Sequence, residues 1–233
     1  NNVAVFELNT QIELIIFESK EAQKKIENIL KKYPNANHSV ISSVGKLNSS
    51  VLNYLQKNTN LQIISHETKF PFTNLYATPK TLGIDRMVVS AGAVLKYPNQ
   101  NRLVIDAGTC ITYDFIDENN NYLGGAISPG IKIRYKSLND YTSNLPLLEK
   151  KNIELFIGNS TENSIHSGII NGICYEIDGF ISQYSLKNQD LTIILTGGDT
   201  DFLAKRLKST IFANSNFLLE SLNTLSIYLN END

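Results

Sequence analysis

The stretch 102-RLVIDAGTCITYDFI-116 joins two apolar runs through a short Asp-Ala-Gly-Thr turn. The first run, Leu103 to Ile105, has the composition of a buried strand, and the second, Ile111 to Phe115, alternates apolar and polar side chains as a half-buried strand does. Two strands this close in sequence pair antiparallel across a tight turn. The stretch therefore predicts a β-hairpin with Asp106 at the end of its first strand.

The turn of this hairpin has the chemistry of a phosphate site. Gly108 lets the backbone approach a ligand and adopt a positive φ, so the amides of Gly108 and Thr109 can face phosphate oxygens. Asp106 offers only acceptor oxygens, which suit Mg²⁺ or its water shell. Taken alone, the stretch fits an ordinary hairpin with an Asp and a Gly in its turn equally well.

Composition narrows the class of protein. The 233 residues are 42% hydrophobic and carry a net charge of −2, which allows one large domain or two smaller ones and gives no electrostatic reason to expect a nucleic-acid partner. With no signal peptide and no apolar run long enough to span a membrane, we expect a soluble, cytoplasmic protein that does not bind membranes. Cys110 and Cys174 lie in apolar segments and are expected to be free buried thiols, not a disulfide or metal pair.

Upstream of the hairpin, strand and helix patterns alternate. The expected elements, in chain order, are strands at 3–6 and 12–17, a helix capped by Ser19 and ended by Tyr33-Pro34, a strand at 38–44, a helix at 48–57 and a strand at 61–65. A loop over residues 66–82 then leads into an apolar helix that reaches about Leu95.

Downstream of the hairpin, the same alternation returns. The expected elements are a strand at 122–127, a helix carrying Arg134 and Leu138, a helix from Asn159 or Ser160 to about Tyr184, a strand at 191–195, a helix at 199–209 and a final helix at about 219–229. The recurrence predicts a duplicated α/β fold, with halves at residues 1–97 and 98–233.

Glycine-bearing turns follow several expected strands of the second half. There are four of them: Asp106 to Thr109, Gly124-Gly125, Ser128-Pro129-Gly130 and Thr196 to Asp199. Ligands of open α/β sheets bind at the carboxyl ends of strands, so we expect these turns to line one crevice. Gly197 and Gly198, between a strand and a helix, favour nucleotide binding at the helix N-terminus, although glycines also end strands for steric reasons.

Asp85 and Arg86 begin a helix directly after Leu82-Gly83. As a functional pair, Asp85 would take a proton from a substrate hydroxyl and Arg86 would bind a carboxylate. The alternative is an acidic residue stabilised by the helix dipole, with a solvated arginine beside it. Thr161 likewise has two interpretations, as a helix cap or as a residue whose hydroxyl reaches substrate.

Several spaced motifs, in this order, resemble type III pantothenate kinase. They are Tyr76-x-x-Pro79-x-x-Leu82-Gly83-x-Asp85-Arg86, Asp106-Ala107-Gly108-Thr109-Cys110-x-Thr112, Gly124-Gly125-Ala126-Ile127-x-Pro129-Gly130, Thr142-x-x-Leu145-Pro146, Thr161 to Gly168, and Thr196-Gly197-Gly198-Asp199. The resemblance covers the chain from about residue 70 onward, and the first 65 residues match only in layout.

The resemblance implies a fold of the actin-like ATPase and sugar kinase superfamily, with two ribonuclease-H-like halves and a cleft between them. It also implies the transfer of the ATP γ-phosphate to the 4′-hydroxyl of pantothenate, the first step of coenzyme A synthesis. Mg²⁺ and a monovalent cation, K⁺ or NH₄⁺, would assist, and the enzyme would be a homodimer. The long helix also favours a homodimer, because it has more apolar positions than one buried face needs. These positions are Ile165, Ile169, Ile170, Ile173, Ile177 and Phe180.

Roles for single residues follow from the same resemblance. Asp85 would be the catalytic base, Arg86 the ligand of the pantothenate carboxylate, and Asp106 the metal ligand. The further contacts it implies are Tyr76, Gly83, Ile84 and Thr161 for pantothenate, and Gly108, Thr109, Gly197 and Gly198 for ATP.

The chain departs from the family pattern in two places. The family opens with an Asp-x-Gly-Asn-Thr phosphate loop, and this sequence begins at Asn1, beyond that loop. We therefore expect a polypeptide of these residues alone to bind ATP weakly and to turn over poorly. Asn139 stands where relatives often carry His, in a contact expected to reach the partner subunit.

Two other functions fit parts of the sequence. One is a phosphotransferase of the same superfamily that acts on a sugar or a small acid, although no sugar-binding side chains stand out near Asp85. The other is a non-catalytic, accessory regulator of transcription. The intact Asp85-Arg86 pair, and the lack of a basic stretch or helix-turn-helix pattern, favour the kinase.

Overall fold

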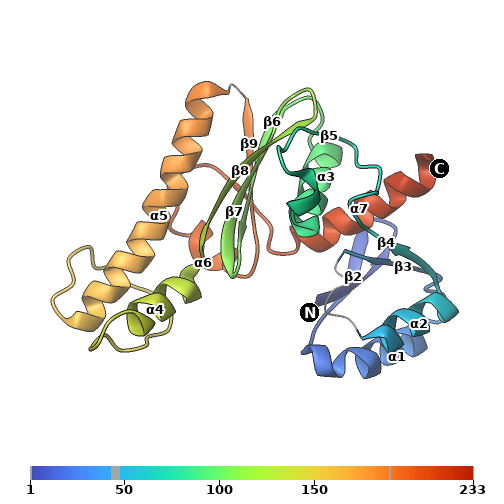
Figure 1. Cartoon of the computed structure of the whole chain (residues 1–233), viewed down its shortest axis with the longest axis horizontal. Coiled ribbons are helices and arrows are strands. Elements are labelled where there is room, and N and C mark those ends of the chain that lie inside the picture. The colour runs from blue at the N-terminus through green and yellow to red at the C-terminus, as the bar shows by residue number, and fades with distance from the viewer. Residues whose placement is uncertain (1, 43–47, 189, 233) are drawn as a thin grey trace. The chain divides into compact units, whose positions relative to one another are not determined.

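The computed structural model describes residues 2–42, 48–188 and 190–232, which form two compact units (Figure 1). The first unit comprises Asn1–Phe72, Ala77–Leu95 and Phe217–Asp233, and the second comprises Thr73–Tyr76 and Lys96–Asn216. The change of unit after Leu95 lies beside the boundary expected at residue 97. The last 17 residues, which the sequence placed in the second half, belong to the first unit.

The second unit is built on a six-stranded sheet with the order β10-β9-β6-β7-β8-β5. Its strands are β5 (Thr73–Asn74), β6 (Asn101–Ala107), β7 (Cys110–Ile116), β8 (Asn121–Pro129), β9 (Leu191–Thr196) and β10 (Phe212–Ala213). Strands β6 to β8 form an antiparallel meander, β9 runs parallel to β6, and β10 runs parallel to β9. Strand β5 pairs parallel with β8 at one edge of the sheet.

The predicted hairpin is confirmed. Arg102 pairs with Ile116 and Ala107 with Ile111, so Gly108 and Thr109 form the bend. The branched side chains of the first run are fully buried, which makes β6 the central strand on which the others assemble.

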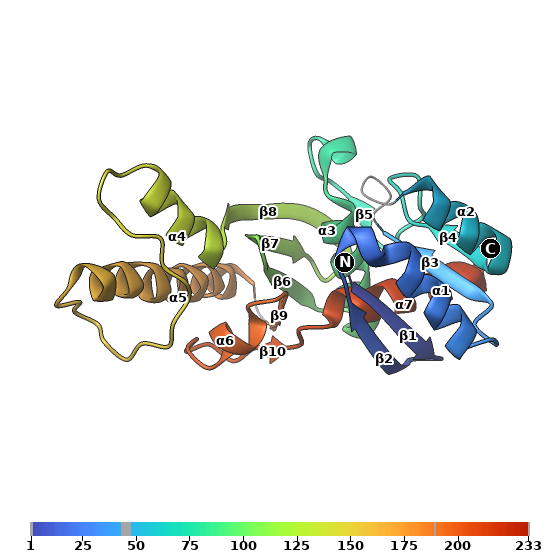
Figure 2. The same ribbon diagram turned by 90° about the horizontal axis from the view of Figure 1, so that it is seen from below.

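Three helices cover one face of this sheet: α4 (Ile131–Asp140), α5 (Thr161–Lys187) and α6 (Thr200–Ala204) (Figures 1 and 2). The apolar positions of α5 pack into this core, and Phe180 stacks on Tyr113 with ring centroids 4.1 Å apart. The expectation that they exceed one buried face is therefore wrong, because the sheet and α4 of the same chain cover them.

The first unit follows the expected order of strand, strand, helix, strand, helix, strand. Its strands form two separate pairs, antiparallel β1–β2 and parallel β3–β4. The elements are β1 (Asn2–Glu7), β2 (Thr10–Ile16), α1 (Ala22–Lys32), β3 (His38–Ile41), α2 (Ser49–Asn58), β4 (Asn60–Ile63), α3 (Ile84–Lys96) and α7 (Phe217–Asn232). Strand β3 was expected to reach Val44, which lies outside the described residues.

Helix α7 joins the first unit through its apolar side. Leu222, Leu225 and Leu229 are buried together with Val88 and Ala91 of α3. Packing between the two helices is close, because a Cβ added at Gly92 would lie only 1.9 Å from Ser221 Oγ. Sequence order alone could not reveal this return of the chain.

Several boundaries differ from the sequence expectation. Ser19 begins a short 3-10 turn and does not cap α1. Helix α6 ends at Ala204 and not at Ser209, because Lys208 N and Ser209 Oγ donate instead to the Asp178 carboxylate of α5. Among the described residues, no helix is long and apolar enough to cross a membrane.

Candidate active site

Two turns lie side by side at the carboxyl ends of β6 and β9. The β6–β7 turn is Gly108–Thr109 and the β9–α6 turn is Gly197–Asp199. Asp106 pairs with Thr196 at the ends of these parallel strands, and Asp199 N donates to Ala107 O at 3.0 Å. The structure thus brings together Asp106 and the four glycine and threonine residues assigned to ATP, as expected for the end of a parallel strand pair.

Gly197 is required at this junction. Its φ is +96°, and a Cβ added there would lie 2.4 Å from Asp106 Oδ1 and 2.5 Å from Ala107 O. A side chain would therefore push apart the two strand ends and displace the Asp106 carboxylate.

The outer side of these turns is open backbone. No atom of the described part of the chain lies within 4 Å of a Cβ added at Gly198, and the atoms nearest one at Gly108 are 3.8 and 3.9 Å away. Thr109 is exposed, and the buried Thr196 Oγ1 has no hydrogen-bond partner among the described residues. Bare backbone beside a hydroxyl and a carboxylate fits a phosphate group with its counter-cation.

The β8–α4 junction, Ser128–Gly130, closes on the same edge. Gly130 N donates to Thr109 O at 3.0 Å, and a Cβ at Gly130 would lie 2.2 Å from Gly108 O. Three of the four glycine-bearing turns therefore meet. The fourth does not, because Gly124 and Gly125 lie within β8 and not at its end.

Asp199 has a partner of its own. Lys150, on the segment between α4 and α5, forms an ion pair with its carboxylate. Lys150 and Arg206 both lie over the ring of Phe202, on α6. These contacts hold the 141–160 segment beside the β9–α6 turn.

In the first unit, Gly83 to Arg86 form the start of α3. Met87 N donates to Gly83 O at 3.1 Å, and Asp85 Oδ1 accepts from Arg86 N at 2.9 Å. Gly83 leaves room for that carboxylate, since a Cβ there would lie 2.4 Å from Asp85 Oδ1. Asp85 is exposed while Arg86 is buried, so Asp85 stabilises the helix start and still presents an accessible carboxylate.

Tyr76 belongs to the second unit and packs on Tyr122, with ring centroids 6.1 Å apart. Tyr122 is anchored in turn by its hydroxyl, which donates to Asp114 at 2.6 Å. Gly124, with a φ of +104°, provides space for the Tyr76 ring. Tyr76 thus rests on a fixed aromatic surface.

Thr161 is the first residue of α5 but not its cap. Ser160 caps the helix by accepting a hydrogen bond from Asn163 N at 3.2 Å. Thr161 is exposed, and the first turn of α5 lies beyond α4 from the ends of β6 and β9 (Figure 1). Within this unit, the structure does not bring Thr161 to the β6–β7 turn.

Two other sequence expectations concern nearby residues. Asn139 donates from Nδ2 to Leu145 O at 2.8 Å and so holds the 141–160 segment of its own chain. Cys110 and Cys174 are both free, but Cys110 is exposed, which corrects the expectation of two buried thiols. Cys110 is the first residue of β7, directly after the bend.

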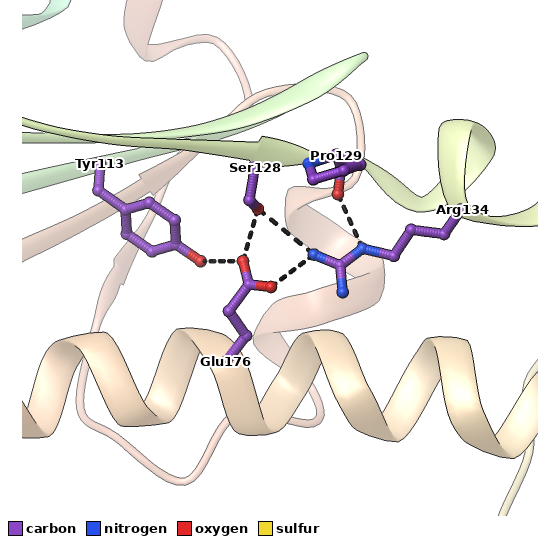
Figure 3. Close-up of polar contacts among 5 residues, drawn as sticks. All are labelled: Tyr113, Ser128, Pro129, Arg134 and Glu176. Atoms are coloured by element: carbon purple, nitrogen blue, oxygen red, sulfur yellow. Dashed lines mark hydrogen bonds and ion pairs between the residues drawn. The ribbon is translucent and has the colours of Figure 1, made fainter. Parts of the chain in front are cut away.

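A polar cluster behind the β8–α4 junction went unnoticed in the sequence. Glu176 of α5 meets Tyr113, Ser128 and Arg134 there (Figure 3). The available signal was an acidic residue set among the apolar positions of a buried helix, which requires polar partners.

Comparison with known proteins places this geometry in a family. The family model described as type III pantothenate kinase matches residues 5–183. Curated type III pantothenate kinases of Flavobacterium johnsoniae and Christiangramia forsetii are 57% and 52% identical, over 99% and 94% of this chain and 94% and 90% of theirs.

Solved structures with lower identity share the fold. A candidate Baf family transcriptional activator from Campylobacter jejuni matches with a TM-score of 0.58 and 24% identity, over 89% of each chain. A candidate N-acetylmannosamine kinase from Listeria monocytogenes matches with a TM-score of 0.53 and 15% identity, over 100% of this chain and 96% of its own. At these identities, the likeness concerns the α/β fold of the two units.

Proposed function

The chain belongs to the type III pantothenate kinase family, and from this premise we propose how its residues carry the reaction. The reaction is ATP-dependent phosphorylation of pantothenate, the first step of coenzyme A synthesis. One observation supports these residue roles above all. The β6–β7 and β9–α6 turns meet, and their open glycine backbone lies beside Asp106.

The ATP side of the reaction is assigned to this edge of the second unit. The backbone amide of Thr109 would bind phosphate oxygens. Gly108, whose own N–H donates to Cys110 O at 2.9 Å, would let the backbone lie close to the phosphates, and Gly197 and Gly198 would lie against the nucleotide. The described residues contain no group of three or more His, Cys, Asp or Glu side chains suited to a metal ion. A cation at this site would therefore have Asp106 as its one carboxylate ligand and would take further oxygen ligands from the ATP phosphates, as Mg²⁺ commonly does.

Cations would neutralise the charge that collects on the transferred phosphoryl group. Asp106, with the Thr109 hydroxyl nearby, is the residue we assign to Mg²⁺ and to a monovalent cation, K⁺ or NH₄⁺. The fit rests on the open backbone described above and on the acceptor-only carboxylate.

The pantothenate side is assigned to Asp85 and Arg86. Asp85 would accept the proton of the 4′-hydroxyl while that oxygen bonds to the γ-phosphorus and the bond to the β,γ-bridging oxygen breaks, releasing ADP. Arg86 would bind the pantothenate carboxylate. Tyr76, Gly83, Ile84 and Thr161 complete the proposed contacts.

We place the enzyme in the cytoplasm as a homodimer. The dimer is supported by the family and by three consecutive apolar side chains before α5 that are exposed in the single chain: Leu155, Phe156 and Ile157. A dimer would also give Thr161 a route to substrate that its own unit does not offer.

A coupled assay tests the proposed function. The protein as expressed from its own gene is supplied with ATP, Mg²⁺ and K⁺, and ADP release is followed with pantothenate, with hexoses and with N-acetylhexosamines. We expect ADP release with pantothenate and none with the hexoses or the N-acetylhexosamines. Release with a sugar, and none with pantothenate, would replace the proposal with a sugar kinase.

A further inference from the structure

Glu176 is the centre of a hydrogen-bonded cluster between α5 and the sheet. Its Oε1 accepts from Tyr113 Oη at 3.0 Å and from Ser128 Oγ at 2.5 Å, and its Oε2 accepts from Arg134 Nη2 at 2.6 Å. In Figure 3, the carboxylate rises from α5 toward the strands, with Tyr113 on one side and Arg134 on the other. One side chain thus joins β7, β8, α4 and α5.

Arg134 extends this cluster to the backbone of the β8–α4 junction. Its Nε donates to Pro129 O at 2.8 Å, and its Nη2 also lies 3.3 Å from Ser128 Oγ. A guanidinium that binds a carboxylate with one nitrogen and a carbonyl with another holds both in a fixed geometry. The junction is therefore tied to α5.

The junction in turn holds the β6–β7 turn. Gly130 N donates to Thr109 O at 3.0 Å, and the Cα of Gly130 faces Gly108 O so closely that an added Cβ would lie 2.2 Å away. A displacement of the junction therefore moves the carbonyls of Gly108 and Thr109, and with them the amides beside them.

The cluster keeps its charge at neutral pH. Burial alone would raise the pKa of Glu176, but hydrogen bonds from Ser128 and Arg134, with the charge of Arg134, hold it below its usual value. The Arg134 and Glu176 side chains are 21% and 25% exposed, so solvent screens the pair only in part.

We propose that Glu176 is a positioning residue for ATP, which fixes the β6–β7 turn through Arg134 and the β8–α4 junction. The inference rests on the proposed function, in which Gly108 and Thr109 bind the phosphates. Glu176 touches no reacting atom, so its loss should weaken ATP binding and leave pantothenate binding intact.

The test compares two variants with a matched control. Glu176→Gln keeps the shape and removes the charge, while Arg134→Lys keeps the charge but cannot hold Glu176 and Pro129 O together. Lys136→Gln, on the same helix, removes only an exposed ion pair with Asp140. We expect both test variants to raise the KM for ATP about tenfold, as small misplacements do, with the KM for pantothenate within about twofold of wild type and the control unchanged.

Hydrogen exchange of the ligand-free protein gives a second readout. The amides of residues 108–110 and 130 should exchange faster in both test variants than in the control. The double variant should be no worse than the worse single one, because both act through one path. If Glu176→Gln does not fold, Arg134→Lys carries the same test.

The outcomes separate the two proposals. A wild-type protein that does not phosphorylate pantothenate would refute the proposed function, while hydrogen exchange would still test the restraint on the turn. An active wild type whose test variants keep its ATP KM and its exchange rates would overturn the role of Glu176. Equal rises in the KM for both substrates would also overturn it, since they would indicate a general structural loss.

Discussion

The backbone N–H of Asp199 donates a hydrogen bond to the carbonyl oxygen of Ala107 at 3.0 Å. This bond joins the β9–α6 turn to the end of β6, and it places Gly197 directly against the Asp106 carboxylate. Two motifs about 90 residues apart in sequence thereby form one surface, because parallel strands bring their carboxyl ends to the same edge of a sheet.

Substitution at the two neighbouring glycines should have opposite results. Gly197→Ala places a Cβ 2.4 Å from Asp106 Oδ1 at a positive φ, and we expect it to lower the free energy of unfolding by about 1–3 kcal/mol. Gly198→Ala meets nothing within 4 Å and should leave stability nearly unchanged. Thermal unfolding of both variants checks this, and equal stabilities would show that the turn has room to adjust.

Removal of the proposed base should affect turnover far more than stability. Asp85→Asn keeps the shape of an exposed side chain at the start of α3 and should lower kcat by about 10²–10⁴-fold. The loss of a helix-dipole interaction should cost only about 0.3–1 kcal/mol of stability. Wild-type turnover in this variant would leave Asp85 as a helix-start residue alone.

Arg86 should discriminate for the carboxylate of pantothenate. Loss of a charge-assisted hydrogen bond is worth about 1.5–3 kcal/mol, so Arg86→Gln should raise the KM for pantothenate by roughly 10- to 100-fold. The same substitution should hardly change the KM for a pantothenate analogue in which an alcohol replaces the carboxylate. Because Arg86 is buried, its substitution could also disturb the fold, so the KM for ATP and the thermal unfolding serve as controls. An equal rise in KM for pantothenate and for its alcohol analogue would argue against the contact.

Glu176 should contribute a pH-dependent part of the stability. Its pKa is held below the usual value of about 4.3 in the folded state, so this contribution is present above that pH and is lost as pH falls through the folded pKa. Glu176→Gln should therefore flatten the fall in unfolding free energy below about pH 4.3. Denaturant titrations at pH 7 and through the acid range measure the difference, and parallel curves would contradict it.

The sequence predicted the elements that local patterning controls. The hairpin at Asp106 and the strand before Gly197 both carry apolar runs closed by glycine turns, and both were found where expected. Their meeting was also predictable, since strands followed by ligand-binding turns tend to lie parallel in such sheets.

The parts of the structure that the sequence did not predict depend on contacts between residues far apart in the chain. Strand β10 contains two residues, and α7 returns to the first unit through packing of Leu222 and Leu225 that no local pattern records. Glu176 finds its partners 42 to 63 residues away. The sequence analysis did not single out Glu176, because nothing local to α5 shows which side chains its carboxylate meets.

The oligomeric state is a separate prediction. The chain has a mass of 26.1 kDa, and light scattering of the purified protein at micromolar concentration should report twice the mass of its subunit. Charged substitutions at Phe156 and Ile157, which are 70% and 77% exposed, should shift the protein toward the monomer. A monomer in the unmodified protein would refute the dimer.

Direct observation of the transferred phosphate tests whether the protein phosphorylates pantothenate. The protein as expressed from its own gene is incubated with pantothenate and with ATP whose γ-phosphate carries ¹⁸O at its non-bridging positions, and the products are analysed by mass spectrometry. We expect 4′-phosphopantothenate that retains the three labelled oxygens, formed far more slowly by Asp85→Asn. Labelled inorganic phosphate with no phosphorylated pantothenate would contradict it.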